Sequence, residues 1–198
     1  MTALPRLSPL AQSGVFATEY RGENLRFFAR DGLRLLRVRS LAGPAGPAAA
    51  PRAWPQATGE TSEGAVTVLC LRPGEWLCFG EPGSGIEALP EMLDPADSAT
   101  YDLSDGLAVF QLEGPAAPWL LSKFSGLDFP AGIRLGAHCA RTRLDDAIAI
   151  VHCDDNARIG LFVDRSLARH FWERLTESAP HAEHLVTESR APRVRGAA

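Results

Sequence analysis

The stretch "YDLSDGLAVFQLEGPAAPWLLSKFSGLDF", residues 101–129, decides the fold class of this chain. Its segment 107–112 is rich in β-forming residues and follows a turn at Asp105-Gly106, which predicts a strand. Gly114-Pro115 then begins a helix, since proline is tolerated in the first helical turn. The apolar residues of this helix recur three or four positions apart: Ala116, Leu120 and Phe124. The stretch therefore predicts a strand followed by an amphipathic helix.

The flanking sequence predicts further strands and helices. Short β-rich runs predict strands at 65–71, 75–79, 139–143, 147–153 and 159–163. Arg72-Pro73-Gly74 separates the first two and residues 144–146 separate the next two, so each pair predicts a hairpin. A short helix is expected at 86–93. The last helix is expected to begin with Ser166 as its N-cap and to end at Pro180. Its apolar stripe consists of Leu167, Phe171 and Leu175.

The N-terminal third carries weaker patterns. Residues 24–41 place apolar residues on both sides of Asp31-Gly32, which favours a hairpin. The arginine-rich amphipathic helix remains an alternative for the same residues. Residues 42–59 are rich in alanine and proline and predict a flexible loop, because proline removes backbone donors.

The predicted fold class is α+β, with mostly antiparallel sheets packed against helices. We expect an N-terminal lobe over residues 1–97, which includes the Ala/Pro loop 42–59, and a C-terminal α+β lobe over residues 98–198.

Composition excludes several functional classes. The chain has 198 residues, of which 45% are hydrophobic, so it can bury a core. A net charge of −4 indicates neither a nucleic-acid surface nor a polybasic membrane patch. No run reaches the roughly 18 apolar residues of a membrane helix, and the N-terminus has no secretory pattern. We therefore expect a soluble cytoplasmic protein with reduced thiols.

The polar cluster Asp102, Ser104 and Asp105 has the residue types of a catalytic site. A nucleophilic serine needs a base within hydrogen-bond reach, and neither a nearby histidine nor a GxSxG turn is present in the sequence. We expect these side chains to bond to backbone amides and to shape the entry into the following strand.

The pairs His138-Cys139 and His152-Cys153 raise the question of a metal site. Neighbouring residues of a strand point to opposite faces, so each pair offers one ligand to a given face. A turn centred on Asp145 would place His138 opposite His152 and both cysteines on the other face. Two ligands per face fall short of a closed zinc site, so we expect structural thiols. The sequence assigns no catalytic, cofactor-binding or metal-binding residue to this chain.

Four sequence blocks in order resemble the gamma subunit of heterotetrameric sarcosine oxidase. They are "RPGEWLCFG" at 72–80, the stretch 101–129, "CARTRLDDAIAIV" at 139–151 and "LFVDRSLARHFWERL" at 161–175. The resemblance spans roughly residues 66–179. More distantly, the strand–Gly-Pro–helix unit is similar to the folate-binding fold of the glycine cleavage T-protein and other aminomethyltransferases. The lysine-glycine-cysteine block of one branch of those proteins is absent, because Lys123 precedes Phe124-Ser125-Gly126.

The resemblance implies a non-catalytic subunit of a complex that demethylates sarcosine oxidatively. The products would be glycine, hydrogen peroxide and, with tetrahydrofolate, a methylene carrier. The implied partners are a large flavoprotein alpha subunit, a flavin-bearing beta subunit and a small zinc-binding delta subunit. FAD, FMN, NAD, zinc and tetrahydrofolate would be bound by those partners and none by this chain. The alternative is a free-standing folate-binding or aminomethyltransferase-like protein.

A subunit of such a complex needs a surface for its partners. Tryptophan and arginine are enriched at protein interfaces. On that ground we expect interface residues among Trp119, Arg141, Arg169 and Trp172.

Overall fold

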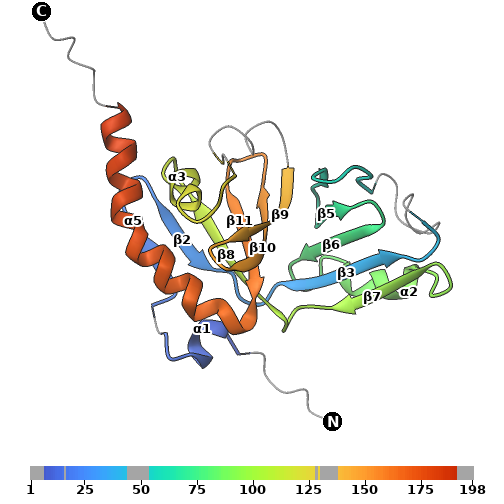
Figure 1. Ribbon diagram of the computed structural model, residues 1–198. Helices are drawn as coiled ribbons and strands as arrows, with labels where there is room; N and C mark the ends of the chain where they lie inside the picture. The colour runs from blue at the N-terminus through green and yellow to red at the C-terminus, as the bar shows by residue number, and fades with distance from the viewer. Residues whose placement is uncertain (1–6, 16, 44–53, 128, 130–137, 191–198) are drawn as a thin grey trace, which may run out of the picture.

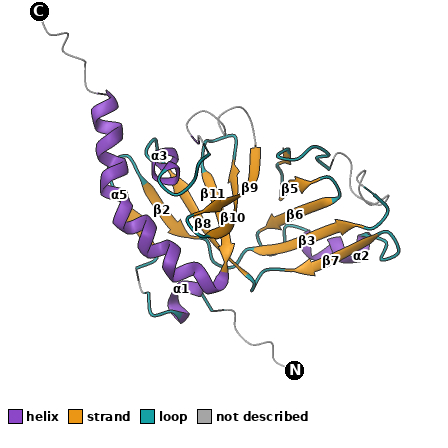
Figure 2. Ribbon diagram, in the orientation of Figure 1, coloured by secondary structure: helices purple, strands orange, loops and turns teal. Residues whose placement is uncertain are grey.

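Two antiparallel sheets form the body of the protein, with helices on their outer sides. The computed structural model describes residues 7–15, 17–43, 54–127, 129 and 138–190 (Figure 1). Figure 2 shows helices beside one sheet and a shorter helical segment beside the other. The α+β class predicted from the sequence is confirmed.

The larger sheet has six strands and combines both ends of the chain. In spatial order they are β1 (Glu19–Arg21), β2 (Arg26–Ala29), β8 (Leu107–Glu113), β11 (Ile159–Asp164), β10 (Ala147–Cys153) and β9 (His138–Leu144). Every neighbouring pair is antiparallel. We refer to it as the six-stranded sheet.

The smaller sheet has five strands, also antiparallel. In spatial order they are β4 (Thr61–Ser62), β5 (Val66–Arg72), β6 (Glu75–Gly80), β3 (Arg34–Ser40) and β7 (Ser98–Asp102). The predicted hairpins β5–β6 and β9–β10 are both present.

The helical segments cover the outer faces of the sheets. They are α1 (Pro9–Gln12), η1 (Ile86–Ala88), α2 (Leu89–Met92), α3 (Ala117–Ser122), η2 (Arg165–Leu167) and α5 (Ala168–Arg190). Helices α3 and α5 pack on the six-stranded sheet through a core that includes Phe27, Phe110 and Trp172. Ile86 and Leu89 pack with Trp76 on the outer face of the five-stranded sheet.

A third core lies between the two sheets. Leu35, Leu77 and Phe79 of the five-stranded sheet pack with Val109 and Phe162 of the six-stranded sheet. The order of layers is therefore helix, sheet, sheet and helical segment. Burial of apolar side chains on both faces explains why the strands β6 and β8 read as nearly continuous apolar runs.

The segment 24–41 forms neither the predicted hairpin nor the alternative helix. β2 pairs with β1 and β8, whereas β3 pairs with β6 and β7. Asp31-Gly32 is a crossing from one sheet to the other, and Gly32 has a φ of 85°. The two strands pair with other strands because their apolar residues pack in different cores. Phe27 of β2 packs in the core beneath α3 and α5, whereas Leu36 and Val38 of β3 pack with Trp76.

The last helix departs from its predicted ends. Asp164, and not Ser166, is the N-cap residue, and its carboxylate accepts a hydrogen bond from the backbone N–H of Ser166. Pro180 lies inside α5 at an exposed position, and Thr176, whose carbonyl loses its usual N–H donor to the proline, is an exposed residue as well. Beyond it, Ala182 and Val186 are buried, and this packing continues the helix.

The turn from β8 into α3 requires its glycine. Gly114 has a φ of 98°, and a Cβ there would overlap the carbonyl oxygen of Asn24. The same oxygen accepts a hydrogen bond from the Ala116 N–H at 3.1 Å, which fixes the start of the helix. The predicted apolar face of α3 is buried: Ala116, Leu120 and Phe124.

The sheets do not divide the chain at residue 97. β1 and β2 lie in the six-stranded sheet with the C-terminal strands, and β7 (Ser98–Asp102) lies in the five-stranded sheet. Of the Ala/Pro loop 42–59, residues 44–53 lie outside the described residues. Trp54, at its end, is 7% exposed, and Pro55 accepts a hydrogen bond from the Trp76 indole at 2.7 Å.

Trp172 and Trp119 should differ in their effect on stability. Trp172 is 6% exposed and its ring lies 5.2 Å from Phe27, so Trp172→Ala should lower the free energy of unfolding by about 3–5 kcal/mol. Trp119 is 37% exposed, so Trp119→Ala should cost less than half as much. Urea unfolding followed by circular dichroism measures both. Equal losses for the two variants would contradict the assignment of Trp172 to the core.

Candidate functional site

The cluster Asp102, Ser104 and Asp105 lies where the chain crosses between the sheets. Ser104 is 9% exposed, and its hydroxyl accepts a hydrogen bond from the Leu35 N–H at 3.0 Å. Asp102 accepts from the Ser104 N–H at 2.9 Å and pairs with Arg34 at 3.0 Å. The expectation that this segment bonds to backbone amides is confirmed. Its polar groups hold the two crossings of the chain together.

The His-Cys pairs are placed differently from the prediction. Leu144 pairs with Ala147 across a two-residue turn, so His138 pairs with Cys153 and Cys139 pairs with His152. The predicted register was wrong by one residue, because Asp145 adopts a φ of 49° and allows the tighter turn.

The described thiols are withdrawn from water. Burial raises the pKa of Cys78 and of Cys139 to about 12 in each case. The Cys139 sulfur lies 3.6 Å from the carbonyl oxygen of Cys70, on the neighbouring sheet. A raised pKa keeps a thiol protonated and weakly nucleophilic, so these cysteines serve packing.

His152 lies between the sheets beside a carboxylate. It is 5% exposed, its Nε2 lies 3.1 Å from Glu63 Oε1, and its ring contacts Phe79 at 5.8 Å. Burial lowers the pKa of His152 to about 4, although Asp154 and Asp155 act in the opposite direction. Burial also raises the pKa of Glu63. The imidazole is therefore neutral at pH 7 and donates to the carboxylate.

The described residues contain neither a metal-binding cluster nor a membrane-spanning helix. Within the described ranges, no group of three or more His, Cys, Asp and Glu side chains is arranged to hold a metal ion. No helix in the described part of the chain is long and apolar enough to cross a membrane.

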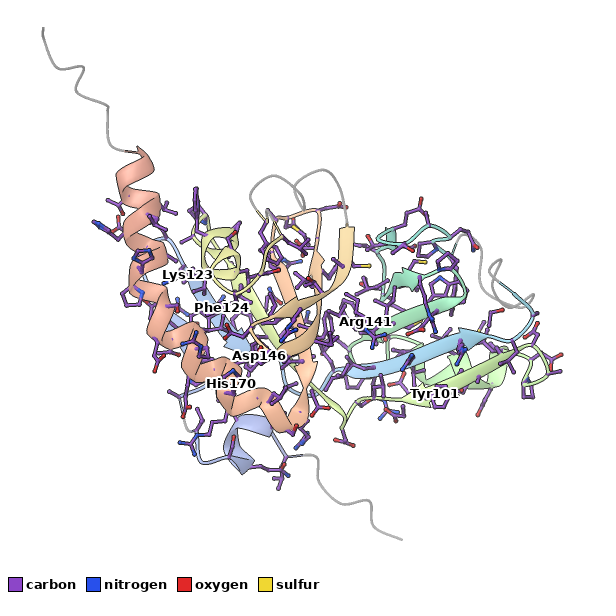
Figure 3. The ribbon with its side chains drawn as sticks, in the orientation of Figure 1. Tyr101, Lys123, Phe124, Arg141, Asp146 and His170 are labelled. Carbon is purple, nitrogen blue, oxygen red and sulfur yellow. The ribbon has the colours of Figure 1, made fainter. Side chains whose placement is uncertain are left out.

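The candidate site is a cleft between the two sheets, which we call the inter-sheet cleft. It encloses about 420 Å³. Its walls include apolar side chains of both sheets and of the crossing segment: Leu71, Leu77, Leu103, Leu107, Ile148 and Phe162. Arg37, Glu75 and Arg141 also line it. Figure 3 shows Arg141 between the two sheets. A mainly apolar cleft with a few convergent polar groups has the character of a binding site.

Glu75 is the electrostatic centre of this cleft. Its side chain is 1% exposed, and its Oε1 lies 2.7 Å from Arg37 and 3.6 Å from Arg141. Its Oε2 accepts a hydrogen bond from Arg72 at 2.6 Å. A carboxylate buried this deeply requires positive partners, because desolvation is costly. Arg141 reaches it from the six-stranded sheet, so the ion pair spans the cleft.

The predicted interface residues occupy different environments. Arg141 is half exposed in the inter-sheet cleft, with a side chain 50% accessible. Trp119 lies partly exposed on α3, and Arg169 pairs with Glu173 on the surface of α5 at 2.7 Å. Trp172 packs within the core, so its ring does not reach the surface. The four residues therefore do not form one cluster in the structure.

Sequence reasoning did not identify Glu75 or Ile148, whereas Arg37 belongs to the arginine-rich segment 24–41, whose arginines could bind an anion or contact a subunit. A glutamate at the start of the apolar run EWLCF was the available signal for Glu75, since a charged residue in a buried strand needs partners. No local pattern indicates Ile148, whose exposure depends on the opposite sheet.

Comparison with known proteins shows what the chain is similar to. No family model matches it. Sarcosine oxidase subunit gamma of Arthrobacter sp. is 39% identical over 93 residues, which are 43% of this chain and 46% of that protein. The match thus spans a little under half the length of this relative. The sequence resemblance to a gamma subunit is confirmed over that part.

Two solved structures share the fold. A chain of heterotetrameric sarcosine oxidase from Corynebacterium sp. U-96, in complex with pyrrole 2-carboxylate, superposes with a TM-score of 0.72 at 23% identity, covering 89% of this chain and 96% of that one. Glycine cleavage system aminomethyltransferase T from Bartonella henselae gives a TM-score of 0.56 at 14% identity, covering 77% of this chain and 45% of that one. The predicted likeness to the aminomethyltransferase fold is confirmed.

The buried His152 should make stability depend on pH. Its pKa of about 4 in the folded protein is below the usual 6.5, so the unfolded chain takes up the proton first as pH falls. Stability should be fully present above pH 6.5 and decrease towards pH 4, by up to about 3 kcal/mol from this group.

His152→Gln, which keeps a donor for Glu63, should remove that part of the decrease. Urea unfolding of both proteins at several pH values between 4 and 7 measures the difference. Parallel curves for the wild type and the variant would show that His152 does not carry the effect.

Proposed function

We propose that this chain is the gamma subunit of a heterotetrameric sarcosine oxidase. The match to a curated gamma subunit, 39% identical over 93 residues, carries the proposal. The shared fold with a chain of such an oxidase supports it, since the superposition covers 96% of that chain. The complex would oxidise the N-methyl group of sarcosine to give glycine and hydrogen peroxide, and would pass the one-carbon unit to tetrahydrofolate.

Within this complex the chain acts by structure and supplies no reacting group. Two described residues with catalytic potential have structural partners: the Ser104 hydroxyl bonds to Leu35, and His152 is buried beside Glu63. The thiol of Cys139 has its pKa raised to about 12 by burial, which opposes nucleophilic use. The resemblance to the gamma subunit assigns flavin, dinucleotide, zinc and folate chemistry to the alpha, beta and delta partners.

The proposal places the protein in the cytoplasm with those partners. Trp119, Arg141 and Arg169 are the candidates for contact with them, because each has exposed surface and belongs to a type enriched at interfaces. Folate binding by the free chain is a weaker alternative. It rests on the likeness to aminomethyltransferase T, which at 14% identity concerns the fold alone.

Assembly and activity provide the direct test. Co-expression with the large flavoprotein, the beta subunit and the delta subunit should yield one complex by size-exclusion chromatography that produces peroxide with sarcosine. The purified chain by itself should be colourless and should not bind a reduced folate tightly. A chain that elutes alone, absorbs in the flavin bands or oxidises sarcosine unaided would refute the subunit assignment.

Trp119→Ala should weaken assembly of the complex. A central aromatic anchor contributes about 2 kcal/mol or more to association, so the dissociation constant should rise at least tenfold. Tyr101→Ala is the matched control, since Tyr101 is 53% exposed on the other sheet. Sedimentation at several concentrations measures the constants. Unchanged assembly of the Trp119 variant would remove Trp119 from the interface.

A further inference from the structure

Part of the apolar wall of the inter-sheet cleft is exposed to solvent in this chain. Ile148 on β10 is 57% exposed at this cleft, whereas Leu77 and Phe162 deeper inside are 0% and 2% exposed. An exposed isoleucine continuous with a buried apolar surface presents a contact area to a second molecule.

Arginines outnumber carboxylates immediately around Glu75, on one side of this cleft, although Arg72 lies outside the cleft lining. Three guanidinium groups, of Arg37, Arg72 and Arg141, surround the one carboxylate of Glu75. Of the two other acids on the lining, Asp146 pairs with Arg143 at 2.6 Å, and Asp164 accepts from the Ser166 N–H at 2.8 Å and keeps its negative charge. With three guanidinium groups against one carboxylate, the immediate surroundings of Glu75 carry excess positive charge.

Hydrogen-bonding capacity also remains around Glu75. Arg37 Nε has no hydrogen-bond partner among the described residues, and Arg141 lies 3.6 Å from Glu75 Oε1, beyond hydrogen-bond distance. Each guanidinium carries five N–H donors in a planar fork that matches a carboxylate. Arg37 and Arg141, with side chains 36% and 50% accessible, can turn further donors towards an incoming acid.

An edge strand with backbone groups free of described partners lies at the rim of the cleft. β9 is the outermost strand of the six-stranded sheet. The Cys139 N–H on its outer side donates to the Gly59 carbonyl at 2.9 Å. Because backbone groups alternate with a period of two, those of Arg141 and Arg143 point to the same side. No described residue pairs with them there. An extended segment can add to such an edge.

We infer that the inter-sheet cleft docks an extended segment of a partner subunit that carries an aspartate or glutamate next to an aliphatic or aromatic residue. The acid pairs with Arg37 and Arg141, and the apolar side chain packs on Ile148. An exposed apolar rim beside an open strand edge favours a polypeptide over a small carboxylate. The inference rests on the proposed subunit function and names the surface by which the chain binds its partner.

The test uses the co-expressed complex with two variants that attack different parts of the cleft. Arg141→Gln removes a positive charge, and Ile148→Ser removes the apolar contact. Each should raise the dissociation constant about tenfold. Arg21→Gln is the matched control, since Arg21 is 68% accessible on β1, at the opposite edge of the six-stranded sheet. Thermal unfolding of each free variant confirms that it folds.

Two further measurements report on the cleft itself. Association of the wild type should weaken more steeply with added sodium chloride than that of Arg141→Gln, because an exposed ion pair is screened by salt. Hydrogen exchange of the complex should show new protection of the amides of β9 at residues 141–143, and none on β1.

The outcomes separate this inference from the proposed function. If the wild-type chain does not associate with the co-expressed subunits, the subunit function itself fails. If it associates and both cleft variants associate equally well, or if protection appears only outside β9 and β10, the cleft assignment is overturned while the subunit function stands.

Discussion

The arrangement of the protein depends on one backbone joint between its two sheets. The chain crosses from sheet to sheet twice, and the two crossings bond to each other: the Leu103 N–H donates to the Leu35 carbonyl at 2.9 Å, and the Leu35 N–H donates to the Ser104 hydroxyl at 3.0 Å. Buried backbone groups must be paired, so this joint fixes where the crossings lie. Leu35, Phe79 and Phe162 then pack in the space between the sheets.

Glu75 forms ion pairs between the two sheets, in the part of the space between them that the apolar core does not fill. Its carboxylate is 1% exposed and contacts Arg37 of its own sheet and Arg141 of the other. Buried ion pairs are weak evidence for stability, because desolvation offsets much of the attraction. An arrangement with more guanidinium groups than carboxylates is better suited to receiving a second acid. The same residues thus connect the sheets and give the cleft its chemical character.

The proposed supporting role of this chain is consistent with the surroundings of several of its described polar groups. Ser104 and His152 are bonded within the fold, and burial keeps the Cys139 thiol protonated. In contrast, Arg141 and Ile148 reach the surface beside an edge strand. Ser104 and His152 thus have their polar groups engaged inside the fold, whereas Arg141 and Ile148 have surface left for contact with another molecule.

The sequence by itself determined the features that depend on neighbouring residues. The hairpins β5–β6 and β9–β10, the glycine turn into α3 and the buried face of that helix follow from turn residues and apolar periodicity. The prediction that Arg141 contacts a partner rests on its residue type alone and stays a prediction. Only the tertiary structure decided that β2 and β3 belong to different sheets, that α5 continues past Pro180, and that Glu75 gathers arginines from both sheets. These features depend on partners distant in sequence, because strand pairing and charge burial are set by long-range packing, which local propensity does not encode.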